Sequence, residues 1–155
     1  MKDFTKEFNS IIADAYHSLL LMEETKKKYS NAGFSFRDRN TITYLRRHGE
    51  GVKISDIAEY LKISRPSATS LVKKLERNGL VEKVTDAKNE RNTLVSLTRK
   101  GRLFHVFQKR YRDRLADKVC EGFSDKEKEV LYEGFSRLND FFLESIKEAE
   151  DIHKT

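Results

Sequence analysis

A polar face lies opposite an apolar stripe in the segment Ser64–Arg77. Ala68, Leu71, Val72 and Leu75 recur at i, i+3, i+4 and i+7, the spacing of a buried helix face. The other positions are rich in hydroxyl and basic side chains, namely Ser64, Arg65, Ser67, Thr69, Ser70, Lys73, Lys74 and Arg77. These groups donate hydrogen bonds and carry positive charge, so the chemistry that they offer is the binding of a polyanion.

The order of these side chains along the helix suits the major groove of DNA. Arg65, near the start, can reach guanine acceptors. The hydroxyl groups that can reach base edges or thymine methyl groups are those of Ser67, Thr69 and Ser70. Lys73 and Lys74 are better placed for phosphates, which position a protein on DNA but do not specify a sequence.

Two short helices joined by a tight turn are predicted to position this face. The first carries the same apolar spacing, at Ile54, Ile57, Ala58 and Leu61. Ser64 is expected to cap the second helix, with Pro66 in its first turn, where a missing N–H costs nothing. Asn78 and Gly79 end it. Ser55 is expected to cap the first helix and, with the free N–H groups there, to hold a phosphate of the DNA backbone.

The apolar spacing changes from helical to alternating after Gly79. Residues 80–85 and 93–98 alternate, and the charged segment 86–92 separates them, which predicts a β-hairpin with a long polar loop. Lys88 and Arg91 lie in that loop. An arginine there can enter the neighbouring minor groove, where negative potential is concentrated.

Long amphipathic helices are predicted on both sides of this unit. Helical spacing of apolar residues runs through residues 4–22, 36–48, 103–119 and 130–146. Ser35 is placed to cap the second of these helices and Gly49 to close it. Gly122 separates the last two, and Ser124 with Glu127 forms a capping pattern.

The predicted fold is mainly α with a β-hairpin wing: a winged helix-turn-helix flanked by N- and C-terminal dimerisation helices. We assign residues 35–117 to the DNA-binding domain, and residues 1–34 and 118–155 to a helical dimerisation region. The flanking helices carry more apolar residues, many of them Phe, than one small winged domain can cover. A second copy of the chain would cover them.

The net charge of +6 is unevenly distributed. Residues 37–118 hold 21 Lys and Arg against 10 Asp and Glu, a net charge of +11. The two flanks together hold 10 against 15, a net charge of −5. A basic centre indicates a polyanionic partner, most often nucleic acid, although a solvated basic surface gives the same count.

Other features restrict the class of protein. The single cysteine, Cys120, excludes an intramolecular disulfide and fits a reducing compartment. We expect a cytoplasmic location, because the N-terminal residues lack a secretory pattern and no apolar run approaches a membrane span. The sequence shows no Gly-rich phosphate loop, no metal-ligand cluster and no catalytic triad pattern. We therefore expect no enzyme activity, no cofactor and no bound metal.

These motifs resemble the MarR family of bacterial transcription regulators over nearly the whole chain. The most specific matches are Leu75-Glu76-x-x-Gly79-Leu80 and Leu97-Thr98-x-x-Gly101. The resemblance implies a homodimer that presents two recognition helices to a palindromic operator, about 34 Å apart. Repression is the usual mode of action in the family.

The wing departs from the family pattern D-x-R-D-x-R. Asp86 and Arg91 match it, whereas Lys88 replaces the first arginine and Asn89 the second aspartate. The resemblance therefore carries the minor-groove role to Arg91 and an orienting role to Asp86, and supports Lys88 less.

Members of the family respond to ligands that bind between the dimerisation helices and the winged domain. Peroxide-sensing members have a reactive cysteine in the first helix, whereas Cys120 lies in a later, apolar-faced helix, which favours a buried and inert thiol. Zinc-sensing members have two histidines at i and i+4 after the wing. Here His105 is followed by Lys109, so half of that pair is missing.

Residues 97–119 and 121–141 are most similar to the FabT-type repressors of fatty-acid synthesis, which respond to acyl chains on acyl carrier protein. The ten Phe suit an apolar tunnel, although Phe at helical spacing also builds an ordinary core. The basic run at residues 109–114 can meet an acidic carrier protein, DNA or solvent. The candidate pocket residues are Met22, Phe34, His105 and Phe107.

A winged domain used only for protein–protein contact is the alternative. Such modules usually lack a basic recognition face. The basic helix 64–77 therefore favours a sequence-specific DNA-binding regulator.

Overall fold

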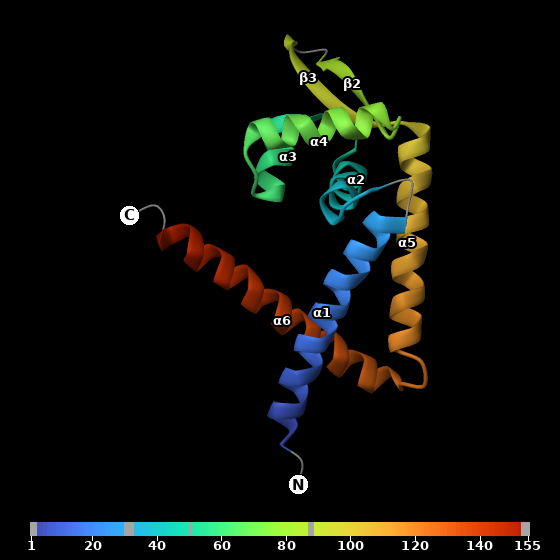
Figure 1. Cartoon of the computed structure of the whole chain (residues 1–155), viewed down its shortest axis with the longest axis vertical. Coiled ribbons are helices and arrows are strands. Elements are labelled where there is room, and N and C mark those ends of the chain that lie inside the picture. Colours follow the sequence, from blue (N-terminus) through green and yellow to red (C-terminus); the bar gives the residue numbers. More distant parts are fainter. Residues whose placement is uncertain (1–2, 30–32, 50, 87–88, 153–155) are drawn as a thin grey trace. The chain divides into compact units, whose positions relative to one another are not determined.

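The computed structural model describes residues 3–29, 33–49, 51–86 and 89–152. The chain forms two compact units, Met1–Lys109 and Arg110–Thr155. The elements in chain order are α1 (Phe4–Tyr29), α2 (Phe36–His48), β1 (Val52–Lys53), α3 (Ile54–Leu61), α4 (Arg65–Arg77), β2 (Val81–Asp86), β3 (Asn89–Leu97), α5 (Arg99–Val119) and α6 (Asp125–Ile152). The boundary between the units falls within α5 (Figure 1).

The predicted caps of α2 and α6 are confirmed. Ser35 caps α2 through a reciprocal pair of hydrogen bonds with Asp38, and Gly49 closes the helix with a positive φ of 78°. Ser124 and Glu127 form the predicted capping box of α6: the Ser124 hydroxyl donates to the Glu127 carboxylate over 2.6 Å. None of the described helices is long and apolar enough to cross a membrane.

The short strand β1 was not predicted. Val52 pairs with Val95 of β3, so the antiparallel sheet has three strands in the order β1-β3-β2. The backbone N–H of Gly51 also donates to the Ser96 hydroxyl over 2.9 Å. Two residues are too few to show an alternating pattern, so the sequence carries no signal for this strand.

The predicted loop of residues 86–92 is too long. Strand β2 continues to Asp86 and β3 begins at Asn89, with a register irregularity between Thr85 and Asp86. Strand pairing needs only backbone N–H and C=O groups, so the ladder continues where the side chains are polar and the alternation is lost. The hairpin projects from the helices beyond α4 (Figure 1).

The core of the first unit joins the helix-turn-helix to the sheet. Ten buried residues form it: Ile42, Leu45, Val52, Ile57, Val72, Leu75, Leu80, Val81, Val95 and Leu97. The apolar stripes predicted for α3 and α4 therefore face this core, as their spacing requires.

The last two members of the motif Leu97-Thr98-x-x-Gly101 join the hairpin to α5 and to the end of α4. The Thr98 hydroxyl donates to the Gly79 carbonyl oxygen over 2.6 Å and accepts from the Gly101 N–H over 3.0 Å. The Thr98 N–H also donates to the Leu80 carbonyl oxygen over 3.1 Å. This motif therefore has a structural role in placing α5.

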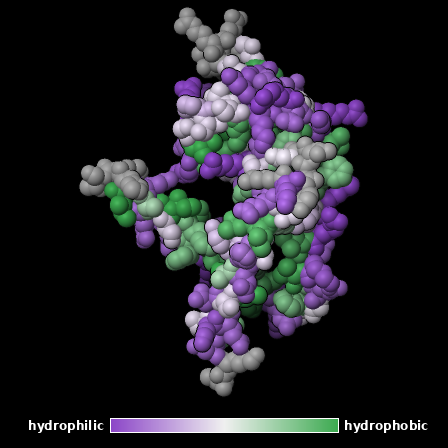
Figure 2. Space-filling model, viewed as in Figure 1, coloured by the Kyte–Doolittle hydropathy of each residue, from purple (hydrophilic) through white to green (hydrophobic). Residues whose placement is uncertain are grey.

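The long helices leave large apolar side chains exposed. No described residue of α6 is buried. The exposed side chains include Phe4, Ile11 and Leu20 of α1, Leu103 and Leu115 of α5, and Val130, Phe135, Phe141 and Phe142 of α6. Hydrophobic surface along the long helices is visible in green in Figure 2. The assignment of residues 1–34 and 118–155 to dimerisation stays a prediction.

Candidate nucleic-acid interface

Helix α4 begins at a well-formed turn. The backbone N–H of Lys62, which has a left-handed conformation with a φ of 52°, donates to the Glu59 carbonyl oxygen over 3.1 Å and ends α3. The Ser64 hydroxyl then accepts from the Ser67 N–H over 3.3 Å, and Pro66 occupies the first turn of α4. The predicted cap and the predicted place of the proline are both confirmed.

An aromatic contact holds α3 against α2. The rings of Tyr44 and Tyr60 stack with their centroids 4.2 Å apart. Burial raises the pKa of the Tyr44 phenol, and the nearby carboxylates of Asp56 and Glu59 raise it further. The raised pKa favours the neutral form of the Tyr44 phenol in the folded helix-turn-helix.

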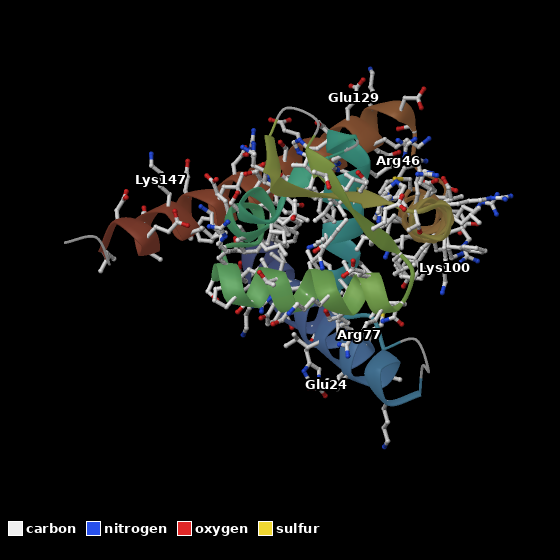
Figure 3. The ribbon with its side chains drawn as sticks, turned by 90° about the horizontal axis from the view of Figure 1, so that it is seen from above. Glu24, Arg46, Arg77, Lys100, Glu129 and Lys147 are labelled. Atoms are coloured by element: carbon white, nitrogen blue, oxygen red, sulfur yellow. The ribbon has the colours of Figure 1, made fainter. Side chains whose placement is uncertain are left out.

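The outward side of α4 presents the predicted side chains. Its exposed members are Arg65, Ser67, Ser70, Lys73 and Arg77. Arg65, Thr69, Lys73 and Arg77 are spaced by four residues, so they form one row along the helix. Figure 3 labels Arg77 on α4, together with Lys100 at the start of α5.

Some hydroxyl groups on this side already have partners within the helix. The Thr69 side chain is half-buried, and its hydroxyl donates to the Arg65 carbonyl oxygen over 2.9 Å. The Ser64 and Ser67 hydroxyl groups share a hydrogen bond of 2.8 Å. Ser70 is exposed beside this row, next to Thr69.

Lys74 differs from the other basic residues of α4. Its Nζ donates to the Asp38 carboxylate over 2.5 Å and to the Gly33 carbonyl oxygen over 3.2 Å. Asp38, which has an exposed fraction of only 2%, was not singled out by the sequence analysis. The sequence did offer a signal for Asp38: an acidic residue three positions after a serine is the pattern of a capping box.

The structure describes the backbone of the wing strands β2 and β3 and the side chains at the base of the wing. Lys88 lies outside the described residues, and the side chains of Asp86 and Arg91 lie outside the described part of their strands. The base of the wing is joined to α4, because the Lys83 ammonium group contacts the Glu76 carboxylate over 2.7 Å. The roles predicted for the wing residues therefore stay predictions.

The predicted cap at Ser55 is wrong. Helix α3 begins at Ile54 with Lys53 in the cap position, and the Ser55 hydroxyl donates to Asp56 over 3.1 Å. The cause is strand β1, which runs directly into the helix and moves its start two residues earlier. Ser55 is exposed in the first turn of α3, and its predicted contact with a DNA phosphate stays a prediction.

The four candidate pocket residues do not share one environment. Phe34 is half-buried and contacts Phe104 edge to face, with centroids 4.9 Å apart. Met22 and His105 are also half-buried, whereas Phe107 has an exposed fraction of 68%. A ligand role for them stays a prediction.

Gln108, one helical turn beyond Phe104, was not predicted as a site residue. It has an exposed fraction of 9%, and neither side-chain amide atom has a hydrogen-bond partner in the described part of the chain. Such a group is costly unless something pairs with it. The sequence did offer one signal for Gln108: it is a polar residue at the helical spacing of the apolar residues of α5.

Two expectations about sensor chemistry can be compared with the structure. Cys120 is half-buried in the turn after α5, so the expectation of a buried thiol is wrong. Within the described residues, no group of three or more His, Cys, Asp or Glu side chains is placed to hold a metal ion.

A capped helix with an exposed basic row, preceded by a helix and a tight turn and followed by a β-hairpin, defines a winged helix-turn-helix. Residues 32–92 match a family model described as MarR family. YybA of Bacillus subtilis, an uncharacterised HTH-type transcriptional regulator, is 30% identical over 106 residues, which cover 66% of this chain and 71% of YybA. The chain belongs to the MarR family of transcription regulators.

Two further similarities agree with this membership. This chain is similar to a crystal structure of Streptococcus pneumoniae FabT in complex with DNA, with a TM-score of 0.76 and 26% sequence identity. The alignment covers 90% of this chain and 98% of the FabT chain. The transcriptional activatory protein BadR of Rhodopseudomonas palustris is 40% identical over 58 residues, 37% of this chain. The match spans 32% of BadR's own length. The expectation that the chain is not an enzyme is confirmed by the family.

Proposed function

We propose that the chain is a sequence-specific DNA-binding repressor that acts as a homodimer on a palindromic operator. The observation that carries this proposal is the exposed row on α4, which offers Arg65, Lys73 and Arg77 from a helix capped at its start. A helix of this kind fits the major groove, with its first turns nearest the bases. The similarity to a FabT that was crystallised with DNA supports the same interface.

In this interface Arg65 and Ser70 read base edges, and Lys73 and Arg77 neutralise phosphates. Ser67 and Thr69 assist from positions partly committed to bonds within α4. Lys88 and Arg91 of the wing reach the minor groove, with Asp86 orienting Arg91, and Ser55 adds a backbone contact.

The homodimer is supported by the exposed apolar side chains of α1, α5 and α6. Phe141 and Phe142 have exposed fractions of 62% and 51%, and Val130 has one of 71%. Surfaces of this kind are typical of subunit interfaces. A two-fold dimer places the two α4 helices about one turn of DNA apart, about 34 Å, which requires a palindromic site.

An apolar effector is the second part of the proposal, and it is favoured by Gln108. This buried amide lies on α5 beside Phe104, which contacts Phe34. A ligand with an apolar body and one polar group would pair with the amide and pack on the rings. The resemblance to FabT-type repressors makes a long acyl chain on its carrier protein the effector to try first.

The test is selection of duplexes from a random DNA pool by the purified protein, with and without a long-chain acyl carrier protein. The proposal predicts an enriched palindrome whose half-sites are separated by about ten base pairs. No enriched sequence in either condition would favour a protein-interaction module instead. An acyl carrier that leaves the affinity unchanged would remove that effector.

The sign of regulation needs a separate measurement. A reporter placed behind the selected site should be transcribed less when the protein is present. Greater transcription would make the protein an activator, as the name of BadR denotes for that protein.

A further inference from the structure

A buried carboxylate joins the start of α2 to the last turn of α4. Asp38 accepts hydrogen bonds from the Ser35 N–H over 2.6 Å and from the Ser35 hydroxyl over 3.0 Å. It also contacts the Lys74 ammonium group over 2.5 Å. Its side chain has an exposed fraction of 3%, and a carboxylate buried to this extent is costly unless it is paired.

The Lys74 ammonium group is held from several directions. Besides Asp38 it contacts the Gly33 carbonyl oxygen, and it lies 5.8 Å from the centroid of the Phe34 ring. Gly33, Phe34 and Ser35 connect α1 to α2, and we name them the α1–α2 junction. A lysine with an anion, a carbonyl oxygen and an aromatic ring around its ammonium group has less freedom to leave for a phosphate than its exposed neighbour Lys73.

The junction also contacts the long helices. The Arg39 guanidinium group donates to the Phe34 carbonyl oxygen over 2.8 Å and to the Glu23 carboxylate of α1. The Phe34 ring packs on Phe104 of α5. Contacts from α1, α2, α4 and α5 therefore meet within a few residues, all of them inside the first unit.

We propose that the Lys74–Asp38 pair is a latch that sets the position of α4 relative to the α1–α2 junction. Lys74 thus acts on DNA affinity as a positioning residue and does not contact phosphate. This inference rests on the proposed function, because it assumes that α4 enters the groove. A shift of α1 or α5 at the junction reaches α4 through this pair.

The salt dependence of DNA binding separates a positioning lysine from a phosphate contact. Each phosphate contact adds about 0.9 to the slope of the logarithm of the association constant against that of the salt concentration. Lys73→Met is a matched control, because it removes the same charge from the adjacent, exposed position. Lys73→Met should lower the slope by about 0.9 per subunit.

Lys74→Met should weaken binding to the selected operator by about tenfold and leave the slope unchanged. Asp38→Asn should weaken it to a similar degree, and the double variant should bind no worse than Lys74→Met alone, because both substitutions open the same latch. Lys74→Arg, which keeps a cation beside Asp38, should recover most of the affinity. Far-UV circular dichroism checks that each variant is folded.

The contrary outcomes are distinct. A slope lowered by Lys74→Met as much as by Lys73→Met would make Lys74 a phosphate contact and overturn the latch. Wild-type affinity in Lys74→Met, or additive losses in the double variant, would overturn it as well. A wild-type protein that selects no duplex would instead overturn the proposed function. Additive effects of Lys74→Met and Asp38→Asn on urea unfolding would then overturn the latch independently.

Discussion

The Cα of Gly101 packs directly against the carbonyl group of Leu80. A β-carbon added at Gly101 would overlap the Leu80 carbonyl oxygen and would lie 3.2 Å from Cδ2 of Leu97. The obstacle is backbone, which cannot move aside as the end of a flexible side chain can. This close approach brings the first turn of α5 against the start of β2.

Replacing Gly101 by Ala should therefore destabilise the fold. We expect a loss of about 1–3 kcal/mol or more in the free energy of unfolding, although alanine normally stabilises a helix. Urea unfolding measures it. Gly134→Ala in α6, where a β-carbon meets nothing within 4 Å, is the control and should gain up to about 1 kcal/mol. Equal effects of the two substitutions would show that the contact is not tight.

The cap of α6 should make stability depend on pH. The Ser124 hydroxyl and backbone N–H donate to Glu127 and lower the pKa of its carboxyl group below the ordinary 4.5. Because the pKa is lower in the folded chain, the cap stabilises the fold above pH 4.5 and the effect is lost as the pH falls through the folded-state value.

Thermal unfolding at several pH values tests this cap. Glu127→Gln should unfold at a lower temperature than wild type near pH 7, and the difference should shrink towards pH 3. Glu129→Gln, which removes an exposed carboxylate from the same helix, is the control. A difference that stays constant with pH would argue against the cap.

Arg65 should carry sequence preference. Arg65→Ala should relax the preference at one position of each half-site by about 1–3 kcal/mol, because a bidentate contact to guanine is lost. Competition between the selected duplex and single-base variants measures this. Arg77→Ala, at the far end of the same row, should weaken all duplexes alike. A uniform loss with Arg65→Ala would place that residue on the phosphates.

The apolar side of α6 should hold the dimer. Replacing Phe141 and Phe142 together by Glu should give a monomer in sedimentation velocity, because charge at a buried interface is costly. Lys147→Glu on the same helix should leave the mass unchanged. Both Phe are exposed in the single chain, so a chain that is monomeric in solution would show no change.

The helices could be predicted from the sequence, because capping residues and apolar spacing are local features of the chain. Ser35, Ser64 and Ser124 all cap where a hydroxyl precedes an apolar stripe. Strand β1 and the full length of the hairpin were missed, since they depend on backbone pairing with β3. The cap predicted at Ser55 failed for the same reason.

The candidate site could likewise be predicted only where it depends on local sequence. Residue types and spacing give the outward row of α4, because they depend on the helix alone. The partners of Lys74 are different, since Asp38 lies 36 positions earlier in the chain and meets it only through the tertiary fold. The sequence also cannot show whether the Gln108 side-chain amide has hydrogen-bond partners, because that depends on the tertiary fold.

The backbone carbonyl groups at the C-terminal end of α4 accept hydrogen bonds from nearby side chains. The Asn78 side chain donates to the Lys74 carbonyl oxygen, Thr98 donates to that of Gly79, and Lys100 to that of Asn78. The Ser64 hydroxyl accepts a hydrogen bond at the other end, so side chains bind the backbone at both termini of the helix. Such a helix has little conformational entropy left to lose when it meets a ligand, so more of the contact energy remains as affinity.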